Sequence, residues 1–215
     1  ILKDYTMVGM GNSFGNPKKD LEDISKSFDE SLSALKKFNK DSATKKALED
    51  EKKLWAEIKK SILETPSKEK VTTLQHKLDE LLKVANNTTG LFAKQSKEKT
   101  GDIINISGRQ RMLSQRMASL YMLKVWGINS PEFDTKMKDA MKLFKESHQK
   151  LKSFDKNTPK INTLLKKVEH SFKFFEIMSK SKSKFIPSLI YKKSNDILKN
   201  MNEATNLYTK LEGAK

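Results

Sequence analysis

The sequence contains no cysteine, which excludes a disulfide framework and a cysteine-ligated metal site and fits an oxidising or a reducing compartment equally well. With 8 glycines and 5 prolines among 215 residues, it also lacks the frequent turn signals of an all-β protein. No run approaches the roughly 18 consecutive apolar residues of a membrane span, and no secretory signal is recognisable. Since the chain begins with Ile1 rather than Met, we expect a piece of a longer protein, with any targeting segment or membrane anchor outside it.

Charge is abundant instead, at 33% of the residues with a net charge of +16, of which residues 101–215 contribute +12 (23 Lys+Arg less 11 Asp+Glu). A basic chain can bind nucleic acid through its phosphates. Here the lysines are scattered around helices without interleaved aromatic residues, so we expect a solvated basic surface and no nucleic-acid partner. Such a surface also suits a position near anionic lipid.

Residues 107–116 place three arginines and a glycine inside an otherwise continuous amphipathic helix pattern. One seam, spaced by three and four residues, predicts a face buried in its own bundle. Its members are Ile103, Ile106, Gln110, Leu113, Met117 and Leu120. A second seam on roughly the opposite side predicts close packing of another helix around Arg111, at an interface. Its members are Ile104, Ser107 or Gly108, Arg111, Gln115 or Ser114, Ala118, Met122 and Val125.

This motif resembles the signature of the PilJ-like sensor family, the extracytoplasmic domains of type IV pilus chemotaxis transducers, and of the related NarX-like nitrate sensors. The positions that match are Asn105, Gly108, Arg111, Met112, Ser114 and Arg116. The chain differs from the nitrate sensors at Gln115, where they have an aromatic residue, and at Arg109, where they have a small one. The resemblance implies up-and-down four-helix bundles with the motif on the first helix, and Arg111 as the residue that holds an anion.

The expected function is therefore an extracytoplasmic, periplasmic sensory module that binds a small anion such as nitrate or nitrite at a helix interface. Arg111 is the predicted ligand-binding residue, and Ser107, Ser114 and Gln115 flank it as possible hydrogen-bond donors. Gly108 lies one turn before Arg111, where it predicts either a close helix approach beside the ligand or a bend in a long helix.

Arg109 and Arg116 lie about 150° around the helix from Arg111, and we expect them to pair with carboxylates of their own bundle. Facing arginines would repel one another unless an anion lay between them. We also expect a possible homodimer through the Arg111 face, in which a bound anion would lie between the two facing arginines.

An internal repeat with an offset of 116 residues divides the chain into two helical bundles, residues 1–100 and residues 101–215. The paired residues are Tyr5 and Tyr121, Gly11 and Gly127, Phe28 and Phe144, Leu35 and Leu151, Phe38 and Phe154, Asn86 and Asn202, and Thr89 and Thr205. In the middle an offset of 119 pairs Trp55 with Phe174, and we expect these recurring aromatic residues to form the core. The first copy of the motif would precede Ile1 in this alignment.

Proline and capping residues set the expected helix boundaries. The helices are predicted at about 1–12, 17–39, 42–64, 66–128, 131–155, 159–182 and 187–212. We therefore predict an all-α fold of two tandem up-and-down antiparallel helical bundles that share the long central helix. A break near Gly101 is the alternative.

No catalytic constellation, cofactor motif or metal-ligand spacing is recognisable, so we expect neither an enzyme nor a cofactor. The histidines, His76, His148 and His170, are isolated from one another, and His148 aligns with Leu32, which predicts a packed side chain. The main alternative to a sensor is a structural or protein-interaction bundle without a small-molecule ligand. A basic nucleic-acid binder is the third possibility.

Overall fold

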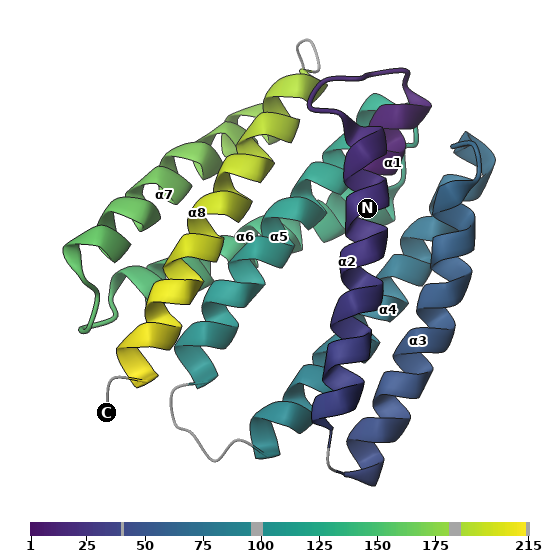
Figure 1. Ribbon diagram of the computed structural model, residues 1–215. Coiled ribbons are helices and arrows are strands. Elements are labelled where there is room, and N and C mark those ends of the chain that lie inside the picture. Colours follow the sequence, from purple (N-terminus) through teal and green to yellow (C-terminus); the bar gives the residue numbers. More distant parts are fainter. Residues whose placement is uncertain (40, 96–100, 181–185, 214–215) are drawn as a thin grey trace. The chain divides into compact units, whose positions relative to one another are not determined.

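The computed structural model describes residues 1–39, 41–95, 101–180 and 186–213, and within these ranges every regular element is an α-helix. The helices are α1 (Leu2–Gly9), α2 (Pro17–Phe38), α3 (Ser42–Leu63), α4 (Lys68–Gln95), α5 (Gly101–Val125), α6 (Pro131–Lys152), α7 (Pro159–Lys180) and α8 (Pro187–Gly213) (Figure 1). The predicted all-α fold is confirmed.

The chain divides into two compact units, unit 1 (Ile1–Glu98) and unit 2 (Lys99–Lys215). Unit 1 contains α1 to α4, and unit 2 contains α5 to α8. The expected shared helix would run through residues 96–100, which lie outside the described residues. Since α4 ends at Gln95 and α5 begins at Gly101, the continuity of that helix stays a prediction, as does the tandem arrangement.

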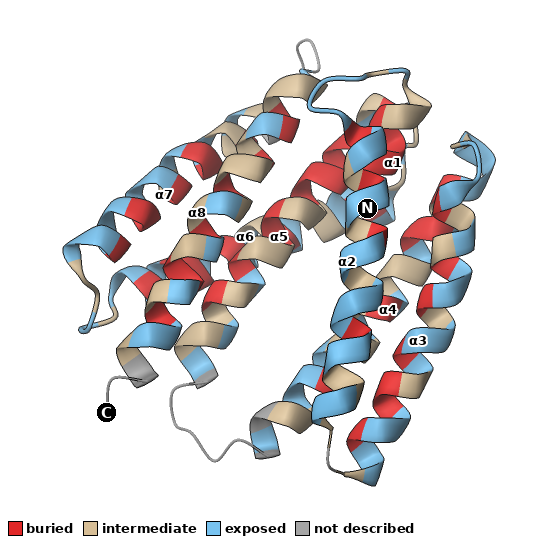
Figure 2. Ribbon diagram, in the orientation of Figure 1, coloured by how far each residue is buried: buried red, intermediate tan, exposed pale blue. Residues whose placement is uncertain are grey.

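In unit 2, α5 packs between α6 and α8, and α7 packs against α6 and α8, as in an up-and-down bundle. Each helix turns one buried face to its neighbours (Figure 2). Helix α6 begins where the sequence predicts, because the side chain of Ser130 accepts a hydrogen bond from the backbone N–H of Glu132 at 3.2 Å and Pro131 occupies the first helical position. Stacked aromatic rings of Phe144 and Phe172, with centroids 4.4 Å apart, lie in the core.

In unit 1, α3 packs along α4, and α2 contacts α1 and α3. Trp55 is buried against Phe28 with ring centroids 4.3 Å apart, and its indole N–H donates to Asp29 Oδ1 at 2.7 Å. The expectation that Phe38 belongs to the core is wrong, because this side chain is 71% exposed. Phe38 is the last residue of α2, where its ring lies 6.3 Å from that of Phe92.

The two units share two details at positions that the predicted repeat pairs. Tyr5 Oη accepts a hydrogen bond from the backbone N–H of Ser67 at 3.1 Å, and Tyr121 Oη accepts one from Ile186 at 3.0 Å. Each bond ties the first helix of a unit to the chain just before its last helix.

The second shared detail is a glycine just after the first helix of each unit, Gly11 at φ 67° and Gly127 at φ 86°. A left-handed backbone at this position is favourable for glycine and closes a helix. The backbone N–H groups of Asn12 and Ile128 donate back to Met7 and Leu123, each at 2.9 Å. The repeat itself stays a prediction.

Candidate anion site on helix α5

The two seams predicted for α5 face two different neighbours within unit 2. On the first seam, Leu113 and Met117 are buried, and Gln110 Nε2 donates to the backbone carbonyl of Phe144 on α6 at 2.9 Å. On the second seam, hydrogen bonds run to α8. The helix that we expected to pack there from an interface is therefore α8 of the same unit.

Arg111 is the only charged residue among the predicted ligand-binding residues, and its side chain is half-buried between α5 and α8. Its Nη1 donates to Asn202 Oδ1 on α8 at 2.8 Å. Within the described part of the chain, no carboxylate forms an ion pair with it. Burial lowers the pKa of the Arg111 guanidinium, which nevertheless stays charged near neutrality because the pKa of an arginine lies far above 7. Among the described residues, this cation thus has no carboxylate as an ion-pair partner.

Gly108 lies directly beside this guanidinium. A methyl group built on Gly108 would meet Arg111 Nη2 at 3.6 Å, which is an ordinary van der Waals contact, and no other described atom outside the backbone of the helix within 4 Å. Within the described part of unit 2 no second helix approaches Gly108 closely, and a close approach by a partner helix stays a prediction. The glycine leaves open the surface next to the charged group.

Ser107 and Ser114 are fully buried, and both hydroxyls have partners inside the bundle. Ser107 Oγ shares a hydrogen bond with Thr205 Oγ1 on α8, and Ser114 Oγ donates to the backbone carbonyl of Arg111 at 2.7 Å. Ser107 thus bonds α5 to α8, whereas the bond of Ser114 lies within α5, and neither hydroxyl lies at the surface.

Gln115 is half-buried one turn after Arg111, and its Nε2 donates to the backbone carbonyl of Ser194 on α8 at 3.0 Å. The five predicted residues therefore share the side of α5 that faces α8, but only Gly108, Arg111 and Gln115 retain accessible surface. Arg109 is exposed and forms no ion pair with a described residue, contrary to our expectation.

The sequence prediction missed the residues of α8 that complete the site. Asn202 orients the Arg111 guanidinium, and Thr205 bonds to Ser107. Both residues recur in the 116-residue repeat, opposite Asn86 and Thr89. This recurrence was the feature of the sequence that could have pointed to Asn202 and Thr205. A repeat does not reveal which helix faces the motif, however.

Residues 92–175 match the PilJ family, described as the N-terminal domain of type IV pili methyl-accepting chemotaxis transducers. The matched segment includes all of α5 and α6 and therefore the whole motif. The PilJ resemblance is confirmed for this segment, whereas the likeness to NarX-type sensors is not shown. The match covers less than half of the chain, and the matched segment is similar to the N-terminal domain of chemotaxis transducers, which suggests a sensory or signalling role.

No curated protein and no solved structure matches this chain. Among the described residues, none of the helices is long and apolar enough to cross a membrane, and no cluster of histidine, aspartate and glutamate has the arrangement of a metal site.

Proposed function

We propose that this chain is the ligand-sensing module of a chemotaxis or related signalling receptor, and that unit 2 binds a small planar anion such as nitrate or nitrite at Arg111. The observation that carries the proposal is the half-buried guanidinium of Arg111, which has an amide partner and no carboxylate partner among the described residues. Partial burial of an unpaired charge is costly, and a bound anion would offset that cost.

The geometry supports an anion that approaches over Gly108. Asn202 occupies one N–H of the guanidinium and fixes its plane, which leaves the other N–H groups for an oxyanion. A planar fork of donors matches a planar anion through two parallel hydrogen bonds. The missing side chain at Gly108 keeps that approach open.

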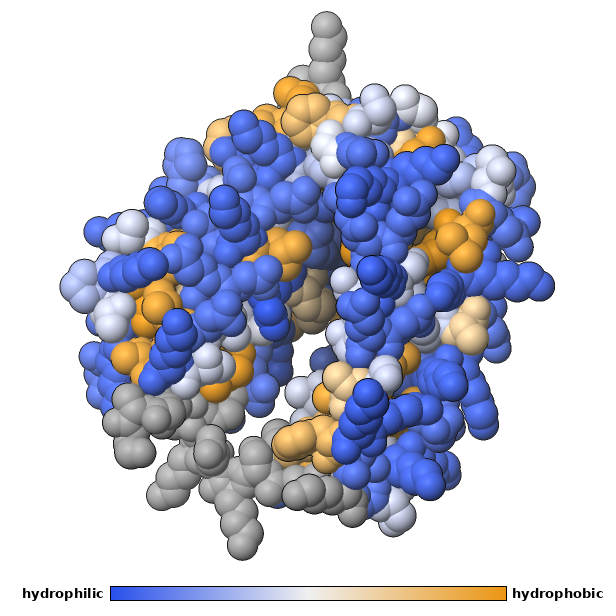
Figure 3. Space-filling model, viewed as in Figure 1, coloured by the Kyte–Doolittle hydropathy of each residue, from blue (hydrophilic) through white to orange (hydrophobic). Residues whose placement is uncertain are grey.

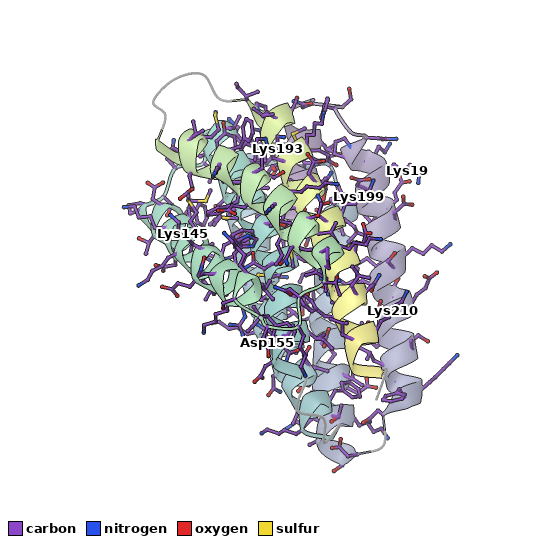
Figure 4. All side chains as sticks on the ribbon, turned by 90° about the vertical axis from the view of Figure 1, so that its left-hand side faces the viewer. Lys19, Lys145, Asp155, Lys193, Lys199 and Lys210 are labelled. Carbon is purple, nitrogen blue, oxygen red and sulfur yellow. The ribbon has the colours of Figure 1, made fainter. Side chains whose placement is uncertain are left out.

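The surroundings of the site attract anions at longer range. The exterior visible in Figure 3 is largely hydrophilic over both units. In unit 2, Lys193, Lys199 and Lys210 follow one another along α8 (Figure 4), the helix that supplies Asn202. Positive charge distributed in this way raises the local concentration of anions.

Anion binding would be transmitted through the contact between α5 and α8. Nitrate on the remaining N–H groups of Arg111, beside the bond to Asn202, would stabilise one of two packings of these helices over the other. A displacement of about 1 to 2 Å along a rigid helix is within the range that signalling proteins use. PilJ-type domains are typically periplasmic, and we propose the same extracytoplasmic location here.

Titration calorimetry with nitrate, nitrite and small carboxylates tests the proposal. A charge-assisted contact contributes about 1.5 to 3 kcal/mol, so Arg111→Ala should weaken binding at least about tenfold. Arg111→Lys should not restore it, because lysine lacks the planar fork. Arg109→Ala is the matched control, since Arg109 is exposed on the same helix, and it should bind as the wild type does. If Arg111→Ala binds the anion equally well, the site is wrong.

The competing function is a protein-interaction bundle without a small ligand. It is favoured by the hydroxyls of Ser107 and Ser114, which are used within the bundle rather than offered to a ligand. A wild-type protein that binds none of the anions in the panel would make this function the better explanation.

A further inference from the structure

Unit 1 contains a cavity of about 360 Å³ where α1, α2 and the turn between α3 and α4 meet. Val8, Leu21 and Ile62 form its apolar wall, and Leu21 and Ile62 are buried. This volume lies in the range of small-ligand pockets, which combine apolar walls with a few polar groups. The cavity lies entirely among residues of unit 1 and is separate from the α5 motif.

Two opposite charges lie at the rim of this cavity. Lys18 and Glu22 both line it, are exposed, and stand one turn apart on α2. Residues four apart on a helix can pair, yet neither forms an ion pair with a described residue. A third rim residue, Glu64, is instead paired with Lys70 at 2.6 Å. The rim thus offers an ammonium group and a carboxylate that are both available to a ligand.

Ser25 supplies a polar group deeper in the same cavity. Its side chain is 5% exposed, and its Oγ has no hydrogen-bond partner among the described residues. A buried hydroxyl without a partner is unfavourable. Rotation about χ1 turns this hydroxyl between staggered positions, so it can meet a polar atom of a bound molecule.

We propose that this cavity is a second ligand site, which binds a free α-amino acid with a largely apolar side chain. The carboxylate of the ligand pairs with Lys18, and its ammonium group pairs with Glu22. The side chain packs on Leu21 and Ile62. Tyrosine binds more tightly than phenylalanine, because its phenol also forms a hydrogen bond with Ser25.

The test is titration calorimetry of the full chain with leucine, phenylalanine and tyrosine. Lys18→Gln and Glu22→Gln are exposed changes that leave the fold intact, and each should weaken binding at least tenfold. Lys19→Gln is the matched control, since Lys19 (Figure 4) neighbours Lys18 but pairs with Asp23 at 2.6 Å and does not line the cavity. It should bind as the wild type does.

Two further measurements distinguish the contact with Ser25 from the contact with Lys18. Ser25→Ala should remove the preference for tyrosine and leave the affinity for phenylalanine unchanged. Phenylalanine methyl ester lacks the carboxylate, so it should bind weakly to the wild type and no more weakly to Lys18→Gln. A ligand that fills the cavity without using Ser25 would give the same tyrosine-to-phenylalanine ratio in both proteins, which would overturn the assignment of Ser25.

The proposal is overturned if none of the three amino acids binds at millimolar concentration, or if Lys18→Gln and Glu22→Gln bind them as the wild type does. The test of this amino-acid site is independent of the test of the anion site. Arg111→Ala should bind amino acids normally, and Lys18→Gln should bind nitrate normally. Either site can therefore fail while the other holds.

Discussion

Because His148 is buried, we expect the protein to lose stability in mild acid through the protonation of this one side chain. The imidazole is 7% exposed on α6 and stacks on Phe144, with ring centroids 6.0 Å apart. Burial lowers the pKa of His148 from 6.5 to about 4, a shift that the nearby charge of Glu169 only partly opposes. The folded protein therefore holds this histidine neutral over a range in which the unfolded chain protonates it.

The size and direction of the effect follow from this difference in pKa. Between pH 6.5 and about 4, the unfolded state binds more protons than the folded state, so the free energy of unfolding falls as the pH falls through this window. One pKa unit corresponds to about 1.4 kcal/mol, which gives a total loss of about 3 kcal/mol by pH 4. Above pH 6.5 the histidine is neutral in both states and contributes no pH dependence.

The perturbation to make is His148→Leu, because the predicted repeat places Leu32, a buried residue, at the equivalent position. Urea denaturation at several pH values should show the variant gaining about 3 kcal/mol over the wild type between pH 7 and pH 4. His170→Leu, at an exposed position on α7 of the same unit, should show little of this gain. Carboxylates that titrate at lower pH affect all three proteins alike and cancel in the comparison.

Two results would refute this reasoning. One is a difference between His148→Leu and the wild type that stays constant from pH 7 to pH 4. The other is a titration of the His148 ring protons, followed by NMR, with a midpoint near 6.5 rather than near 4.

Three other perturbations are expected to have measurable effects. Gly108→Ala should raise the free energy of unfolding by about 0.5 to 1 kcal/mol, because its methyl group meets only Arg111 at 3.6 Å. Titration calorimetry should also show that this variant binds nitrate more weakly. A loss of stability would contradict the open surface beside Gly108. Tyr121→Phe leaves the backbone N–H of Ile186 without its partner and should lower the free energy of unfolding, measured in urea, by about 1 to 3 kcal/mol. Tyr5→Phe should lower it by a similar amount. A negligible change in either variant would argue against that hydrogen bond. Self-association through the half-exposed edge at Arg111 should increase with nitrate in analytical ultracentrifugation, and a monomer at high concentration with and without nitrate would count against a homodimer.

The sequence predicts the helices closely because local chemistry sets their ends. Asn16, Asp41 and Ser130 accept hydrogen bonds from the first turns of α2, α3 and α6. Proline begins α2 and α6. A capping residue acts over three or four positions, so its effect is visible in a short stretch of sequence.

The neighbours of each helix could not be predicted in the same way. Periodicity shows that α5 has two faces, but it does not name the helix that packs on either one. Asn202 lies 91 positions from Arg111, and no local pattern joins them. Phe38 shows the same limit, because its spacing suits a core position while its place at the end of α2 leaves it exposed. The cavity beside Ser25 likewise depends on three segments that only the fold brings together.

Polar side chains form hydrogen bonds across the contact between α5 and α8. Ser107 meets Thr205, Arg111 meets Asn202, and Gln115 meets the carbonyl of Ser194. A large apolar side chain seated in a groove must be lifted out before one helix can slide past another, whereas a hydroxyl or an amide can exchange one acceptor for the next by rotation. Hydrogen bonds of this kind can re-form with new partners after a small shift of one helix along the other. An anion bound at Arg111, as proposed, would need only to stabilise one of these arrangements over the next in order to shift the helix.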